Sequence, residues 1–171
     1  QHQQAGSDCS NVHILKFNEK ENRLEKMFNL ERKGPSQTDH FQMPPQHSSP
    51  SSQAPSSSYS FFIIGNNFDH SISVYQILTT TDNDANMDKE EERAGQTIEL
   101  IENLSVAGVA AMATAYIDES FLLIGASYHD NGWRTHSIVH RFNEGTGRFE
   151  VLQNLPTTGA HDAETLTAKS M

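Results

Sequence analysis

Short apolar stretches separated by polar turns recur along this chain. The clearest are 61–64 and 121–124, each preceded by a serine and followed by a glycine. Both have the length of a strand, and they consist of aromatic and aliphatic residues that suit a pleated sheet. Glycine, asparagine or aspartate bounds most of these stretches, as is typical of strands joined by turns. The pattern predicts an all-β fold.

One pattern occurs three times. Residues 24–30, 98–104 and 149–155 each begin with an apolar residue and a glutamate, place an apolar residue two positions after the glutamate, and end in Asn-Leu. The fourth residue after each leucine is a glycine, namely Gly34, Gly108 and Gly159. A repeated unit buries its hydrophobic face by stacking on its neighbours. The repeat therefore favours a propeller or solenoid scaffold over a single-site enzyme.

The repeat extends to units of four strands. Residues 60–65 match 120–125, and 74–77 match 139–142, with 14–17 as a third copy. Together with the Glu-x-x-x-Asn-Leu strand and one strand directly after the glycine, this gives four strands in roughly 40–50 residues, which is the content of a propeller blade.

Local residue preference does not decide whether the segment after Gly108 is a helix or a strand. Residues 106–117 are rich in alanine, so propensity alone would allow a short helix there. The repeat places this stretch on the innermost strand of a blade, where small side chains suit a crowded centre. We therefore predict a strand.

The units and two polar inserts divide the chain. Neither insert can bury enough apolar surface to offset the entropy of ordering, so both are expected to be mobile surface loops. The predicted parts are a partial first repeat at 11–43, a Ser/Pro-rich insert at 44–58, a second repeat at 59–117 with an acidic insert at 79–95, and a third repeat at 118–171.

Composition narrows the function. Lysine and arginine number 12 against 22 aspartates and glutamates, and the net charge of -10 argues against nucleic-acid binding. No apolar run approaches the roughly 18 residues of a membrane span. Cys9 is the only cysteine, so it forms no internal disulfide and no cysteine-based metal site. A free thiol and a disulfide to another part of the protein both stay open. The chain begins at Gln1 and not at methionine, so we expect a fragment of a longer product.

The order of these motifs resembles the epilepsy-associated repeat (EAR or EPTP) family. Residues 121–128 resemble its aromatic-led apolar strand, and 137–142 its Ser-x-Ile/Val-Tyr-x-Trp/Phe strand. Residues 149–164 resemble its Phe-x-x-x-Gln-x-Ile/Leu-Pro strand and the following Gly-Ala-x-Asp-Trp-Glu. The resemblance covers most of the chain outside the inserts. It implies a seven-bladed β-propeller of which this chain forms a part, with two to three four-stranded blades.

The resemblance also implies a role. Members of the family are secreted or cell-surface proteins that act in adhesion, receptor binding and cell signalling, in one case linked to Notch. We therefore expect an extracellular or cell-surface protein-interaction module, with a cell-surface receptor as partner and no catalytic activity. Two alternatives are an intracellular propeller scaffold and a propeller-fold enzyme that uses His161, Asp162 and Glu164 as acid–base groups in the central channel.

The family's acidic pair falls at Asp162 and Glu164, with Ala163 in place of the tryptophan between them. The second unit has Ala111 and Ala113 at the matching positions. Carboxylates on an inner strand converge near the axis of a propeller, so this pair is a candidate calcium site. The alternative is that the pair caps backbone groups at the start of a strand. No other cofactor is expected.

Three further features are candidates for other sites. Trp133 and Arg134, with Tyr128, lie in the long loop of the third unit and have the composition of an interface anchor. Asn103 opens a glycosylation sequon, although it overlaps a strand whose next residue should be buried. His136 and His140 lie four apart, but on a strand we expect solvent-facing histidines and no zinc site.

Overall fold

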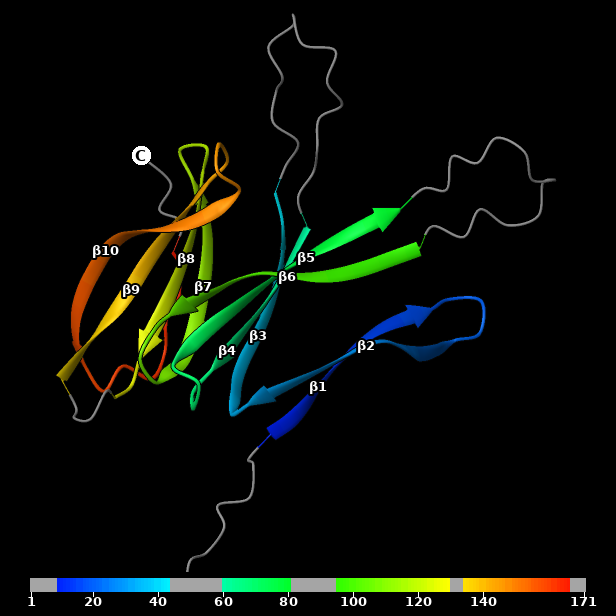
Figure 1. Cartoon of the computed structure of the whole chain (residues 1–171), viewed down its shortest axis with the longest axis horizontal. Helices are drawn as coiled ribbons and strands as arrows, with labels where there is room; N and C mark the ends of the chain where they lie inside the picture. Colours follow the sequence, from blue (N-terminus) through cyan, green and yellow to red (C-terminus); the bar gives the residue numbers. More distant parts are fainter. Residues whose placement is uncertain (1–8, 44–59, 81–94, 130–133, 167–171) are drawn as a thin grey trace, which may run out of the picture.

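The computed structural model describes residues 9–43, 60–80, 95–129 and 134–166. These residues form strands and turns and contain no helix, which confirms the predicted all-β class (Figure 1). The two predicted inserts fall mainly outside the described residues. Accordingly, no membrane-spanning helix is found among the described residues. The strands are β1 (Cys9–Asn18), β2 (Arg23–Lys33), β3 (Pro35–Gln42), β4 (Ser60–Asn66), β5 (Ser71–Thr80), β6 (Gly95–Ser105), β7 (Val109–Ile117), β8 (Ser120–Ser127), β9 (Arg134–Asn143) and β10 (Arg148–Thr158).

The strands form one hairpin and two four-stranded sheets. β1 pairs with β2, β3 to β6 form the second sheet in chain order, and β7 to β10 form the third. Every pair is antiparallel, so both larger sheets are simple meanders (Figure 1). Residues 109–117 are a strand, as the repeat predicts, and the hairpin is the third copy of the last two strands of a sheet.

The repeat is visible in the backbone itself. The last two strands of each sheet contain a β-bulge, and its extra residue lies on the last strand at the same place in every copy. The extra residues are Met27, Ile101 and Leu152. A bulge bends its strand and increases the local twist, so the three copies share the same distortion.

The repeated glycines follow the last strand of each sheet and have a positive φ. Gly34, Gly108 and Gly159 have φ of 57°, 50° and 58°. The carbonyl oxygen of Gly34 accepts a hydrogen bond from the amide of Asn67 at 2.8 Å, and that of Gly108 accepts one from Tyr128 at 2.9 Å. Because this conformation is costly for residues with a Cβ, the glycine is required by the connection and not merely tolerated.

One part of the predicted repeat is displaced by a residue. The match of 60–65 to 120–125 pairs Gly65 with Gly125, but in the sheets Gly65 lies opposite Gln37 whereas Ala126 lies opposite Ala111, the equivalent of Gln37. Side chains alternate between the two faces of a strand, so a slip of one residue reverses every side chain. As a result β4 and β8 present similar sequences to opposite faces.

That slip builds the core between the two large sheets. We call the face of each sheet that is directed toward the next sheet its front face, and the opposite face its back face. Phe41 and Phe61 lie on the front face of the β3–β6 sheet. Phe121, with Phe142 and Phe149, lies on the back face of the β7–β10 sheet and packs against them. Ring centroids are 3.7 Å apart for Phe41 and Phe121, and 5.3 Å apart for Phe61 and Phe142. Stacked and edge-on rings of this kind hold the sheets face to face.

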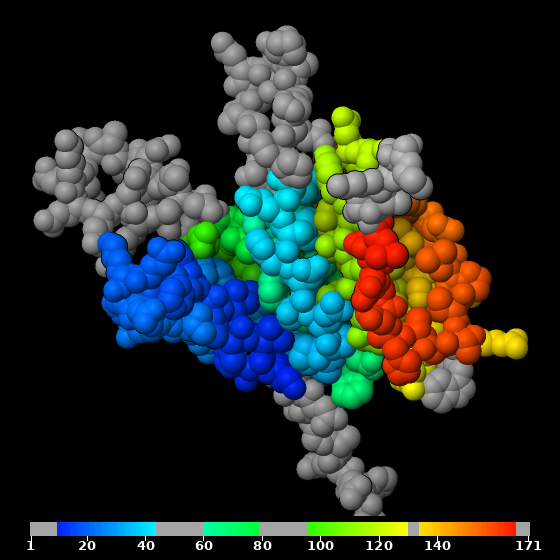
Figure 2. Space-filling view, turned by 180° about the vertical axis from the view of Figure 1, so that it is seen from behind, coloured from blue at the N-terminus to red at the C-terminus, as the bar shows by residue number. Residues whose placement is uncertain are grey.

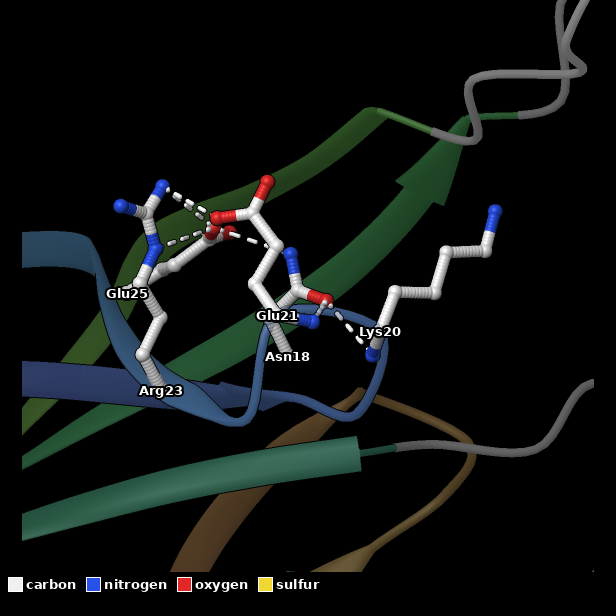
Figure 3. A network of polar contacts seen from close by, with 5 residues as sticks. All are labelled: Asn18, Lys20, Glu21, Arg23 and Glu25. Carbon is white, nitrogen blue, oxygen red and sulfur yellow. Dashed lines mark hydrogen bonds and ion pairs between the residues drawn. The ribbon is translucent and has the colours of Figure 1, made fainter.

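The β1–β2 hairpin turn is held by a small polar network (Figure 3). The Nδ2 of Asn18 donates to Oε1 of Glu25 at 2.9 Å, and its Oδ1 accepts the amides of Lys20 and Glu21. The Arg23 guanidinium pairs with both glutamates. In the β9–β10 turn the repeat supplies the same contact, from Asn143 to Glu150 at 2.7 Å. Gly147 has a φ of 66° there, as expected for this hairpin connection.

The front side of the hairpin faces the second sheet. The Arg32 guanidinium lies over the ring of Tyr75, 5.1 Å from its centroid. Tyr75 is on the back face of the β3–β6 sheet. The hairpin, the second sheet and the third sheet are therefore stacked in this order, with the front face of each packed on the back face of the next.

Candidate functional site

The first strands of successive units lie side by side and are joined by polar side chains. On β3, Oε1 of Gln37 accepts the amide of Met112, and Oδ2 of Asp39 accepts the hydroxyl of Thr114 at 3.1 Å. Both partners are on β7. These two polar side chains of β3 therefore join one sheet to the next.

The segment 160–166 continues this arrangement beyond β7. The Thr165 hydroxyl donates to the carbonyl of Thr114 at 3.2 Å, and the Ala160 amide donates to that of Ser127 at 3.2 Å. Figure 2 shows this segment (red) on the same face of the molecule as β3 (cyan) and β7 (yellow-green). It occupies the place that the first strand of a further unit would take.

The predicted acidic pair lies on this segment. Asp162 and Glu164 are both exposed, and Oδ1 of Asp162 accepts the amide of Ala163 at 2.8 Å. Asp39 binds the amide of His40 in the same way, also at 2.8 Å. Within the described ranges no group of three or more His, Cys, Asp or Glu side chains is placed to hold a metal ion. Asp162 thus contacts a backbone amide within a segment that is not a strand.

A group of aromatic rings gathers at the end of the sheets where the glycine connections lie. We call Phe68, His70, Tyr128, His129 and His161 the loop-end cluster. The ring of Tyr128 is 5.3 Å from that of His129 and 4.3 Å from that of His161. The ring of His129 is 6.5 Å from that of His70, whose Nδ1 accepts the amide of Gly108 at 2.9 Å. These residues come from three connections: the rings of His70, His129, Tyr128 and His161 follow one another in contact, and Phe68 lies beside Gly34.

Two glycine connections support the loop-end cluster directly. A Cβ on Gly34 would lie 2.6 Å from the ring of Phe68, and one on Gly108 would lie 2.4 Å from the backbone oxygen of His129. Phe68 and His129 therefore lie directly against the backbone of Gly34 and Gly108. Phe68 itself remains 62% exposed.

The predicted interaction residues are only partly brought together. Tyr128 is half-buried within the loop-end cluster, and Arg134 is exposed at the start of β9. Trp133 lies outside the described residues. Sequence analysis missed His70 and His129 and named His161 only as an acid–base group of the enzyme alternative. Phe68 and His129 follow equivalent strands at the same distance once the one-residue slip is allowed for.

The predicted glycosylation site is on a strand, as expected. The Asn103 side chain is exposed and its Oδ1 accepts the Ser73 hydroxyl at 2.7 Å, while Leu104 is buried. The asparagine thus points to solvent even though its neighbour belongs to the core.

The prediction of solvent-facing histidines is wrong for one of the two. His136 is exposed, but His140 is only 2% exposed because it lies on the back face of β9, opposite Leu123. Burial lowers the pKa of His140 below the ordinary imidazole value, and a hydrogen bond with the backbone of Leu123 partly opposes this shift. Among the described residues its Nδ1 has no hydrogen-bond partner.

His140 should make the fold sensitive to mild acid. A lowered pKa in the folded state means that the unfolded chain takes up the proton more readily, so stability is complete above the unfolded value of about 6.5 and falls as the pH drops below it. We expect a lower urea midpoint at pH 5 than at pH 7.5, with a smaller difference in a His140→Gln variant. An equal difference in both proteins would contradict this assignment.

Comparison with known proteins found no matching family model, no similar curated protein and no similar solved structure.

Proposed function

We propose that the two large sheets are consecutive blades of a β-propeller and that the β1–β2 hairpin is the outer half of the blade before them. One observation carries the proposal: the first strands of successive units lie side by side, from β3 to β7 to the segment 160–166, while the sheets stack front to back. Strands that converge on one side of stacked meanders are the arrangement of blades around an axis.

The sequence on both sides of this chain in its transcript tests the architecture. A propeller needs further copies of the unit, each ending in Glu-x-x-x-Asn-Leu and a glycine four residues later. We expect enough copies to close a ring, with seven blades in total if the chain is an EAR protein. Flanking sequence without such copies would overturn the propeller.

We further propose that the chain is a protein-interaction module of the extracellular or cell-surface type, with a receptor as its partner. The loop-end cluster supports this, because it brings aromatic side chains from three connections to one end of the sheets and includes Phe68, which is 62% exposed. Rigid aromatic residues supply much of the binding energy of protein interfaces. The exposed sequon at Asn103 supports a secreted protein.

Binding of the purified chain to intact cultured cells tests the role of the cluster. We expect saturable binding that weakens by about tenfold or more in a Phe68→Ser variant, since exposed aromatic anchors of interfaces are worth this much. A Leu152→Ser variant is the control, because Leu152 is also exposed but lies on β10 away from the cluster. Equal binding by all three proteins would contradict the proposal.

Expression through the secretory pathway tests the localisation. We expect a glycosylated product whose mass falls after treatment with peptide N-glycosidase, and no such change in an Asn103→Gln variant. Secretion without any glycan would remove this support, and failure to be secreted would contradict the extracellular assignment.

A further inference from the structure

His70 joins the turn between β4 and β5 to the connection between β6 and β7. The carbonyl oxygen of His70 accepts the amide of Val106 at 3.0 Å, and Nδ1 of its ring accepts the amide of Gly108 at 2.9 Å. One residue of the turn therefore binds two amides of the short segment that leads from the second sheet to the third.

The ring of His70 can hold the Gly108 amide in only one protonation state. Because the amide donates, Nδ1 must carry a lone pair, and the proton of the neutral ring must be on Nε2. In a protonated ring both nitrogens donate and neither accepts. Imidazole groups in general take up this second proton in mildly acidic solution, which backbone acceptors do not.

Both polar groups of Gly108 are bonded in the structure, but only one of the two bonds involves a titratable group. The carbonyl oxygen of Gly108 accepts the amide of Tyr128 at 2.9 Å, while its own amide is held by His70. A Cβ on Gly108 would lie 2.4 Å from the backbone oxygen of His129. The peptide of Gly108 thus lies between the His70 ring and the backbone that follows β8.

A second histidine adds to the effect of acid. The ring centroids of His70 and His129 are 6.5 Å apart. Two protonated imidazoles at this separation repel each other. Acid therefore removes the acceptor of the Gly108 amide and also favours separation of the two loops that enclose Gly108.

The surroundings of His70 contain few other charges. The connection 106–108 has no titratable residue, and no ion pair with His70 is found among the described residues. Asp69 precedes His70 in the turn and Lys33 precedes the Gly34 connection, and both side chains are exposed. Beyond His129 the row of rings continues with Tyr128 and His161.

We propose that His70 is an acid-sensitive latch on the connection between the second and third sheets. At neutral pH its unprotonated Nδ1 holds the Gly108 amide, and in mildly acidic solution the proton displaces this amide and the connection loosens. Since Phe68 shares the turn of His70, and His129 lies against Gly108, the loop-end cluster then differs in shape between neutral and acidic solution. The latch does not depend on receptor binding, so either proposal can fail without the other.

The latch differs from the effect expected for His140. His140 is 2% exposed, so its protonation opposes the packing of the whole fold. His70 is exposed and can take up a proton while both sheets stay folded. The response to protonation of His70 should therefore be confined to the connection and the loops that contact it.

Hydrogen exchange of single amides, measured by NMR at pH 7.5 and pH 5.5 and corrected for the intrinsic effect of pH, tests the latch. We expect the protection of the Gly108 amide to fall by about tenfold at the lower pH, which is the factor that one hydrogen bond contributes. The Gly147 amide is the internal control, because Gly147 also has a positive φ but donates to the backbone carbonyl of Asn143 at 2.8 Å. Unchanged protection of Gly108, or an equal fall at both amides, overturns the proposal.

Two variants assign the response to the His70 ring. In His70→Asn the side-chain Oδ1 replaces Nδ1 as an acceptor that does not titrate, and asparagine tolerates the φ of 49° found at this position. We expect Gly108 to stay protected at both pH values in His70→Asn and to be weakly protected at both in His70→Ala. His140 is present in both variants, so a fall in His70→Asn equal to that of the parent would assign the pH effect to another group.

The nitrogen spectrum of the His70 ring tests the latch without a substitution. Long-range proton–nitrogen correlations of the parent chain should show a proton on Nε2 and none on Nδ1 at pH 7.5, and protons on both nitrogens after acidification. A proton on Nδ1 at pH 7.5 would contradict the proposal, because such a ring cannot accept the Gly108 amide. A ring that remains neutral at pH 5.5 would contradict it as well.

Discussion

A Gly108→Ala variant should lose about 3 kcal/mol or more of its free energy of unfolding, which is a large part of the stability of a small domain. The methyl group meets two separate obstacles. Gly108 has a φ of 50°, a conformation that costs roughly 1–2 kcal/mol for a residue with a Cβ. The new Cβ would also lie 2.4 Å from the backbone oxygen of His129. That oxygen cannot turn away as a side chain can, so the connection between β6 and β7 must shift.

Gly147→Ala separates the two obstacles. Gly147 has a φ of 66°, but nothing lies within 4 Å of the position of its Cβ. We expect the Gly147→Ala variant to lose only the conformational contribution, about 1–2 kcal/mol of its free energy of unfolding. Urea unfolding of the parent and both variants measures the difference. Equal losses in the two variants would show that the contact with His129 does not matter.

Phe142→Ala should destabilise the chain by about 3–5 kcal/mol, the usual range for a buried aromatic residue replaced by alanine. Phe142 is 5% exposed and its ring packs on both Phe61 and Phe149 in the core between the sheets. Its removal leaves a cavity at the place where the second and third sheets meet. The substitution should therefore weaken the packing between the two sheets as well as the third sheet itself.

The repeat offers a matched control at the same place in the unit. Phe17 corresponds to Phe142, on β1 in place of β9, but it is 52% exposed. Phe17→Ala should cost less than about 1 kcal/mol when unfolding is measured at low protein concentration. Similar losses in the two variants would mean that the hairpin is covered in solution and would contradict the described stacking.

Periodicity predicted the strands because each copy repeats the same turn chemistry. Gly34, Gly108 and Gly159 have the same backbone geometry in the three copies. Because this geometry disfavours a Cβ, it is visible in the sequence as a glycine at the same position of each unit. The Ala-rich strand β7 was also predicted from the repeat against its local propensity. Here the position in the unit outweighs the preference of individual residues.

Register could not be predicted in the same way. The motifs at 60–65 and 120–125 look identical in spacing, yet one lies a residue further along its sheet. The alternation of side chains in a run of four apolar residues is hidden, because every residue in the run suits burial on either face. His140 was placed in solvent because histidine is a polar residue, although it faces the neighbouring sheet.

The candidate site was predicted in part. Tyr128 was identified from its loop, whereas His70, His129 and His161 join it only because three connections meet at one end of the sheets. The contact between Asp39 and Thr114 spans residues far apart in the chain and has no signature in the sequence.

The glycine connections enclose whole sheets, since β3 to β6 lie between Gly34 and Gly108, and β7 to β10 lie between Gly108 and Gly159. Two of these glycines share a positive φ and the same hydrogen bond to the amide that follows the second strand. In a deletion variant that joined residue 34 to residue 109, β7 would therefore follow Gly34 with the same backbone geometry with which β3 follows it now. Recombination between the codons of two of these glycines would add or remove one complete four-stranded sheet. The glycines thus mark the points at which such a gene can lengthen or shorten during evolution while every remaining sheet keeps all of its strands.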